Sequence, residues 1–240
     1  MSLRTKLIQS VIHFNENIFF YPKLKKYYST ILTDDVFILD VGSNKGQSID
    51  FFLNINSNIK ILGFEPNKKL FKKIENKYKH VKNVQLKNVG VSDVSGTLVF
   101  NENILDETST FETLNFDSDY LKKKAKILGV KPEQIINASY EVPVITLDSI
   151  IDNESLTNNV IIKIDVEGHE FQCLNGLLSA KQLHKVKYIQ LENHNDDMYA
   201  SRVSFEEMKK MLSASGFEVV NKIKHGFGDF EEVIFSNKNK

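Results

Sequence analysis

The amino-acid sequence predicts an α/β fold in which helices cover both faces of a mostly parallel sheet. The main observation is that, from residue 36 onward, short apolar segments alternate with amphipathic segments of helical length, a pattern typical of consecutive βα units. A second observation is that acidic residues and glycines directly follow several apolar segments, where open α/β sheets bind their ligands. A chain of 240 residues with 41% hydrophobic residues can bury the core of such a fold.

Residues 1–35 are expected to form a helical extension ahead of the main domain, which spans 36–240. Apolar residues between 3 and 31 recur at helical spacing and are interrupted at Pro22, which predicts two short helices. Lys23, Lys25 and Lys26 lie beside aromatic residues, so this segment is a candidate for peripheral membrane contact or for covering a substrate cleft. The alternative is a helical pair that only packs on the domain.

In the main domain, apolar segments predict strands at 36–41, 60–64, 84–86, 160–164, 188–191, 217–221 and 232–235. Amphipathic segments predict helices from the glycine loop to about 53, and at 68–78, 147–151, 169–178 and 204–214. The last two strands follow each other without a helix between them. We therefore expect them to pair antiparallel.

Residues 93–145 depart from this alternation. We expect a hairpin around Ser95 and Gly96, and then a polar stretch over 101–119 that precedes a lysine-rich helix near 120–128. The segment at about 101–140 is interpreted as an insertion that resembles a lid.

Composition argues against several classes of protein. The chain has 31 Lys and Arg residues and 31 Asp and Glu residues, and a formal net charge of zero argues against a nucleic-acid partner. Its single cysteine, Cys173, cannot form an internal disulfide, and no apolar stretch approaches the roughly 18 residues of a membrane span. These features favour a cytoplasmic protein, and they leave its oligomeric state open.

The strongest functional signal runs from Asp40 to Gly46, an acid at a strand end followed by two glycines four positions apart. A dinucleotide-binding loop would carry a further glycine where Asn44 stands, and a P-loop would carry a lysine directly after Gly46. A carboxylate here repels phosphates and suits a ligand with a sulfonium and an amino group, such as S-adenosylmethionine (SAM). Glu65 ends the next strand about 20 residues later, where an acid can accept hydrogen bonds from a ribose.

A second group of chemically active residues follows the strands at 160–164 and 188–191. Asp165 ends the first of these strands and is followed by Glu167 and His169, while Glu192 and His194 end the second. Because the carboxyl ends of parallel strands meet at one sheet edge, we expect these side chains to converge near Asp40 and Glu65. The alternative is that the acids only stabilise the N-terminus of the following helix.

Taken in order, these segments resemble the FkbM-type methyltransferases, a family of SAM-dependent O-methyltransferases. The matching segments are 40–46 (DVGSNKG), 64–67 (FEPN), 88–93 (NVGVSD), 144–148 (VITLD), 163–170 (KIDVEGHE) and the strand that ends at Glu192. The resemblance implies a Rossmann-like class I methyltransferase fold, with a seven-stranded sheet that includes an antiparallel C-terminal strand. It also implies methylation of a hydroxyl, often on a sugar or a polyketide. The matching segments span about residues 36–195 and leave out the N-terminal helices and residues 101–140. The resemblance therefore does not indicate which acceptor is methylated.

The resemblance also implies roles for individual residues. The set expected to bind SAM is Asp40, Gly42, Ser43, Asn44, Gly46 and Glu65, with Asn88 and Ser92 on the adenine side. The residues expected to remove the acceptor proton are Asp165, Glu167, His169, Glu192 and His194. A divalent metal held by Asp165, Glu192 and a histidine could instead acidify the acceptor hydroxyl. The expected partner is a small-molecule or glycan acceptor in a polysaccharide, glycolipid or glycosylated natural product.

Two other functions stay open at this point. A nucleotide-dependent oxidoreductase would bind NAD or NADP despite the incomplete glycine pattern. A non-catalytic binding module on a degenerate methyltransferase fold would bind SAM without consuming its methyl group. His225 begins a glycine-containing loop that we interpret as a plain turn before the last strand, and the alternative is a loop that closes over the substrate.

Overall fold

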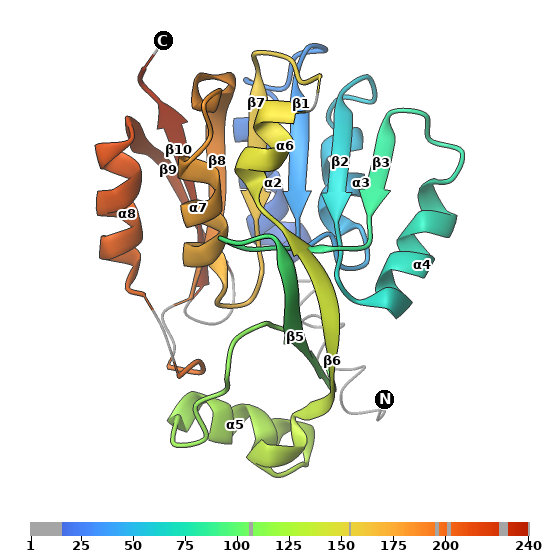
Figure 1. Ribbon diagram of the computed structural model, residues 1–240, viewed down its shortest axis with the longest axis vertical. Helices are drawn as coiled ribbons and strands as arrows, with labels where there is room; N and C mark the ends of the chain where they lie inside the picture. Colours follow the sequence, from blue (N-terminus) through green and yellow to red (C-terminus); the bar gives the residue numbers. More distant parts are fainter. Residues whose placement is uncertain are drawn as a thin grey trace.

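A seven-stranded sheet forms the centre of the computed structural model (Figure 1), which describes residues 16–105, 108–153, 155–194, 197–200, 203–225 and 230–239. Its strands are β1 (Phe37–Val41), β2 (Lys60–Phe64), β3 (Val84–Lys87), β7 (Val160–Ile164), β8 (Val186–His194), β9 (Phe217–Lys224) and β10 (Phe230–Asn237). They lie in the order β3–β2–β1–β7–β8–β10–β9. Among these described strands only β10 runs antiparallel, against β8 and β9. The predicted mostly parallel sheet with an antiparallel C-terminal strand is therefore confirmed.

The central strands are apolar because both of their faces are covered. All residues of β7 are buried, and so are all residues of β1 except its first. Continuous apolar runs rich in β-branched residues are typical of parallel strands that are buried on both sides. The pairing of β1 with both β2 and β7 brings the carboxyl ends of these three strands to one edge.

Helices pack on both faces of the sheet, as predicted (Figure 1). They are α2 (Tyr21–Tyr28), α3 (Gln47–Leu53), α4 (Lys68–Tyr78), α6 (Leu147–Asn153), α7 (Glu170–Leu178) and α8 (Phe205–Ala214), with a short 3-10 helix, η4 (Leu183–Lys185), before β8. Helices α2, α3 and α4 share an apolar cluster with Ile38 and Ile161. Helices α6, α7 and α8 share another with Leu39 and Ile162. Successive strand residues point to opposite faces, so neighbouring residues of β1 and β7 supply the two cores.

The N-terminal segment packs on the face that carries α2. A short π-helix, η1 (Glu16–Phe20), leads directly into α2, and Pro22 lies at the start of α2, where its missing N–H needs no helical partner. Phe20, Leu24 and Tyr28 are buried against the sheet. The first of the two predicted helices falls largely on residues before 16, which lie outside the described residues, and membrane contact stays a prediction. No helix in the described part of the chain is long and apolar enough to cross a membrane.

A smaller sheet, which we call the three-stranded unit (residues 90–145), lies beyond the carboxyl ends of the central strands (Figure 1). It contains β4 (Gly90–Val91), β5 (Gly96–Asn103), α5 (Asp119–Leu128), the 3-10 helix η3 (Pro132–Gln134) and β6 (Ile136–Ile145). The hairpin predicted around Ser95 and Gly96 is wrong, because β4 and β5 flank this turn but each pairs with β6. A local turn signal cannot show that β4 and β5 will each pair with β6, a long strand that is distant in sequence.

Candidate active site

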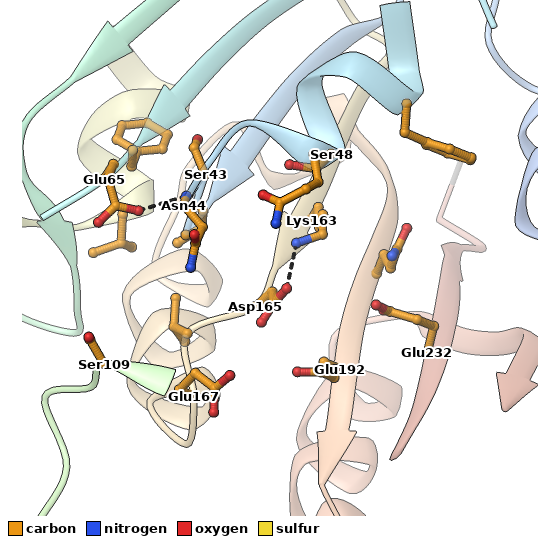
Figure 2. A pocket seen from close by; sticks show the side chains of 18 of the residues that line it. Ser43, Asn44, Ser48, Glu65, Ser109, Lys163, Asp165, Glu167, Glu192 and Glu232 are labelled. Atoms are coloured by element: carbon orange, nitrogen blue, oxygen red, sulfur yellow. Dashed lines mark hydrogen bonds and ion pairs between the residues drawn. The ribbon is translucent and has the colours of Figure 1, made fainter. Parts of the chain in front are cut away.

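A cavity of about 280 Å³ lies at the carboxyl ends of β1, β2, β7 and β8 (Figure 2). The loop after β1, the ends of β7 and β8, the N-terminal segment and part of the three-stranded unit form its wall. This is the sheet edge at which open α/β folds bind ligands. Of the residues predicted from the sequence, those that line it are Gly42, Ser43, Asn44, Glu65, Asp165, Glu167 and Glu192.

The loop after β1, residues 42–46, packs against the ends of both β2 and β7. The backbone N–H groups of Gly42 and Ser43 both donate to the carbonyl oxygen of Phe64, each at 3.0 Å. Gly42 has φ +83°, and a Cβ added there would overlap the carbonyl oxygen of Asp165. Only glycine therefore lets the loop lie this close to the end of β7, with its backbone exposed to the cavity.

Glu65 ties this loop to the start of α4. Its Oε2 accepts a hydrogen bond from the backbone N–H of Asn44 at 2.7 Å, and its Oε1 accepts one from the backbone N–H of Asn67 at 2.8 Å. Asn67 in turn caps α4 by accepting from Lys69 and Leu70. The carboxylate is therefore fixed in position while it lines the cavity.

Asp40 and Gly46 lie behind this wall rather than in it. The Asp40 carboxylate is buried and accepts a hydrogen bond at 2.8 Å from Ser48, whose side chain does line the cavity. The carbonyl oxygen of Gly46 accepts a hydrogen bond at 2.8 Å from the hydroxyl of Tyr78 on α4. Any effect of these two residues on a ligand would thus pass through the loop that they hold.

Asn88 and Ser92 are also outside the cavity wall. The Asn88 side-chain amide donates to the backbone carbonyl of Glu65 at 2.7 Å, and Ser92 Oγ lies 3.0 Å from His169 Nε2. The other ring nitrogen, His169 Nδ1, lies 2.7 Å from Glu112 Oε1 of the three-stranded unit. His169 is thus buried between two partners, and the structure does not bring it to the cavity with the other residues predicted to be catalytic.

Three carboxylates gather where β7 and β8 end. Oxygen atoms of Asp165, Glu167 and Glu192 all lie within 4.8 Å of one another, and Figure 2 shows these side chains around one part of the cavity. Glu167 Oε2 accepts a hydrogen bond from Tyr199 at 2.9 Å. The predicted convergence of Asp165 and Glu192 is thus observed, whereas the side chain of His194 is outside the described part of the structure.

Lys163 is the buried cation beside this group. Its Nζ lies 2.9 Å from Asp165 Oδ2. Burial by itself lowers the pKa of Lys163, but the charges of Asp165 and Asp40 outweigh burial and hold the pKa above its ordinary value. The ammonium group therefore stays charged and fixes the orientation of the Asp165 carboxylate.

Sequence reasoning missed His225 at the far end of the cavity. Its ring stacks on Phe20 with the centroids 4.0 Å apart, and its Nδ1 lies 3.5 Å from Glu16 Oε1. Its Nε2 lies 3.9 Å from one oxygen of Glu192 and 3.9 Å from one oxygen of Glu232. Burial lowers the pKa of His225, but Glu16 and Glu232 outweigh burial and raise the pKa to about 10. The sequence signal that could have indicated a site here was Glu232, an acid in the otherwise apolar run 232–235.

Comparison with known proteins gives the same fold. Residues 40–219 match the methyltransferase FkbM domain. The crystal structure of magnesium protoporphyrin IX methyltransferase from Synechocystis PCC 6803 with bound SAM has a TM-score of 0.53 at 10% identity, over 99% of this chain and 85% of that one. A SAM-dependent methyltransferase from Aquifex aeolicus has a TM-score of 0.48 at 12% identity, over 98% of each chain.

A comparison with curated protein sequences finds no match. The domain match nevertheless covers well over half of the chain, and it includes the loop after β1, Glu65, Asp165 and Glu192. The magnesium protoporphyrin IX methyltransferase, with a TM-score of 0.53, has the same Rossmann-like methyltransferase fold. The chain therefore belongs to the FkbM family of methyltransferases.

Proposed function

We propose that this protein is a SAM-dependent O-methyltransferase that methylates a hydroxyl group, carried by a sugar of a polysaccharide, glycolipid or glycosylated natural product. The observation that carries this proposal is the group of three carboxylates, Asp165, Glu167 and Glu192, placed in one cavity with the glycine loop. A hydroxyl loses a proton when its oxygen attacks a methyl group, and carboxylates are suitable acceptors for that proton. The family resemblance supports a sugar as the carrier of the hydroxyl.

The wall of the cavity fits SAM. Gly42 leaves its backbone open to the cavity, and Glu65 presents a fixed carboxylate that can accept from ribose hydroxyls. Asn44 Oδ1 is buried and has no hydrogen-bond partner among the described residues, so it is available to a donor in the cavity. When bound, SAM supplies an electrophilic methyl group on a positively charged sulfur.

Asp165 is the residue that we propose to accept the proton. It lies at the end of β7 directly beside Gly42, and Lys163 holds its orientation. Glu192, at the end of the neighbouring strand, would bind the acceptor hydroxyl and position it. Holding the reacting groups in line contributes several kcal/mol to catalysis, so this orientation matters as much as basicity.

The three-stranded unit supplies the remaining wall. Ser109 and Phe111 of this unit line the cavity, and Thr110 donates a hydrogen bond at 2.7 Å to the backbone carbonyl of Glu167. A small apolar cluster joins α5 to Met198 and Tyr199, which follow β8. These contacts support the interpretation of residues 101–140 as an insertion that covers the acceptor.

Transfer of a labelled methyl group from SAM to a panel of methyl glycosides and nucleotide sugars tests this proposal, with an RNA pool and a porphyrin as competing acceptors. We expect transfer to a sugar, with kcat lowered about 10²- to 10⁴-fold in Asp165→Asn and in Glu192→Gln. The matched control is Glu218→Gln, which changes an exposed glutamate on β9. Binding of S-adenosylhomocysteine, measured by calorimetry, should persist in all three variants.

The outcomes separate the alternatives. Full activity in both active-site variants would remove Asp165 and Glu192 from the reaction. Methylation of the RNA or the porphyrin instead of any sugar would contradict the proposed acceptor. Cofactor binding without transfer to any acceptor in the panel would favour a non-catalytic binding module. Membership of a methyltransferase family already disfavours the nucleotide-dependent oxidoreductase.

A further inference from the structure

Two glutamates face each other across neighbouring strands at the far end of the cavity. Glu192 on β8 and Glu232 on β10 are directly paired in the antiparallel register, and their side chains are only 14% and 6% exposed. Like charges directly opposite each other destabilise a sheet, and removing them from water adds to that cost. His225 lies beside this pair, and because Glu16 and Glu232 raise its pKa to about 10, its imidazolium offsets the two carboxylates when no metal is bound. A metal ion bound between the glutamates would take the place of that proton.

His225 directs one ring nitrogen toward this pair. Its Nε2 and Glu232 Oε2 are both buried and lack a hydrogen-bond partner among the described residues. The distance of 3.9 Å from Nε2 to each glutamate is too long for a hydrogen bond. Oxygen and nitrogen ligands about 2.0–2.2 Å from one metal ion would lie roughly 3–4 Å apart, which is the spacing observed here.

The other side of the His225 ring has the surroundings that a metal-binding histidine requires. Ligating histidines donate their second ring N–H to a carboxylate or carbonyl group, which fixes the tautomer and the direction of the ring. His225 Nδ1 faces Glu16 Oε1 at 3.5 Å, and the Phe20 ring packs against the imidazole plane. The N-terminal segment thus holds the ring with Nε2 directed at the two glutamates.

We propose that Glu192, Glu232 and His225 form a binding site for one divalent transition-metal ion of the Mn²⁺ and Zn²⁺ class. One imidazole and two carboxylates suit these ions, whereas Mg²⁺ prefers oxygen ligands alone. All three ligand atoms lie within 4.8 Å of one another, and all three residues line the cavity, as Figure 2 shows for the two glutamates. This set shares Glu192 with the metal site predicted from the sequence, but it has Glu232 in place of Asp165 and identifies the histidine as His225.

Three protein ligands leave coordination positions open toward the cavity. An acceptor oxygen bound there would lie beside Asp165, and this part of the inference rests on the proposed function. Metal binding itself does not depend on it. Glu16, Phe20, His225 and Glu232 all fall outside the segment that matches the family, residues 40–219. The site would therefore combine Glu192, from the matched segment, with residues that lie outside it.

The test uses the 240-residue protein after treatment with a chelator, titrated with Mn²⁺, Zn²⁺ or Mg²⁺ alone in a calorimeter. We expect one Mn²⁺ or Zn²⁺ per chain and weaker binding of Mg²⁺. Glu232→Gln and His225→Gln should each weaken binding at least tenfold. Glu16→Gln, which alters only the group behind the ring, should weaken binding about 10- to 100-fold. The matched control is Glu167→Gln, a carboxylate of the neighbouring group, which should bind metal as the wild type does.

Two readouts keep the test decisive. Circular dichroism and thermal unfolding without metal establish that Glu232→Gln and His225→Gln are folded at the titration temperature, so that their loss of metal binding is not attributed to unfolding. Absence of Mn²⁺ and Zn²⁺ binding would overturn the proposal, as would binding that is lost in Glu167→Gln but kept in Glu232→Gln and His225→Gln. S-adenosylhomocysteine binding, measured on the same samples, reports separately on the proposed function.

Discussion

Replacing Gly42 with alanine probes the close approach on which the cavity depends. The left-handed φ of +83° costs an alanine about 1–2 kcal/mol. The added Cβ overlaps the Asp165 carbonyl oxygen, and overpacking of this kind costs about 1–3 kcal/mol more. The sum is about 2–5 kcal/mol, which lowers the melting temperature of a chain of this size by roughly 5–15 °C.

Gly129→Ala is the matched control because it separates the two costs. Gly129 ends α5 with φ +75°, but an added Cβ there meets no atom within 4 Å. This variant should therefore lose only about 1–2 kcal/mol, from the backbone conformation. Thermal unfolding compares the two variants, and calorimetry with S-adenosylhomocysteine should show weakened binding in Gly42→Ala alone. Equal destabilisation and equal affinity in both variants would refute the close packing of the loop against Asp165.

Three further predictions follow from single contacts. Glu65→Gln removes the charge that accepts the hydrogen bond from the Asn44 N–H, and bonds to charged groups contribute about 1.5–3 kcal/mol. This variant should bind S-adenosylhomocysteine about 10- to 100-fold more weakly in calorimetry, and unchanged affinity would contradict the role of Glu65. Tyr28→Phe leaves the buried Gln190 side-chain oxygen without its donor and should cost about 1–3 kcal/mol, seen as a lower urea midpoint at constant slope. Burial and the charge of Glu16 raise the pKa of Tyr21 to about 12, so the contribution of Tyr21 to stability is complete below about pH 10 and is lost as the pH rises through 12. In an ultraviolet titration, Tyr21→Phe should remove an ionisation near pH 12, and removal of one near pH 10 would contradict this prediction.

Periodicity predicted the central sheet well because its strands and helices carry strong local patterns. The strands expected at 60–64 and 160–164 and the helix expected at 68–78 have the same bounds in the structure. The end of a parallel strand also fixes where the next side chains lie, so the strand pattern was enough to place Asp165 and Glu192 at one sheet edge. These predictions needed only short-range information.

The positions that were predicted less well depend on contacts between distant segments. His169 directly follows the acidic cluster in sequence, but Glu112 and Ser92 bind both of its ring nitrogens away from the cavity. In the cavity, the ring of His225 stacks on Phe20, and its Nδ1 lies 3.5 Å from Glu16 Oε1. No local pattern encodes a partner that lies about 200 residues away, which is why a loop histidine was interpreted as part of a plain turn.

The central claim is that the cavity binds SAM, and thermal unfolding with S-adenosylhomocysteine tests it most directly, with NAD as the control ligand. Ligand at about 100 times its dissociation constant stabilises the folded state by about 2.7 kcal/mol, which should raise the melting temperature of this chain by roughly 5–10 °C. We expect that shift with S-adenosylhomocysteine and none with NAD. No shift in folded protein free of copurified cofactor, or an equal shift with NAD, would contradict the assignment of the glycine loop and Glu65 to SAM.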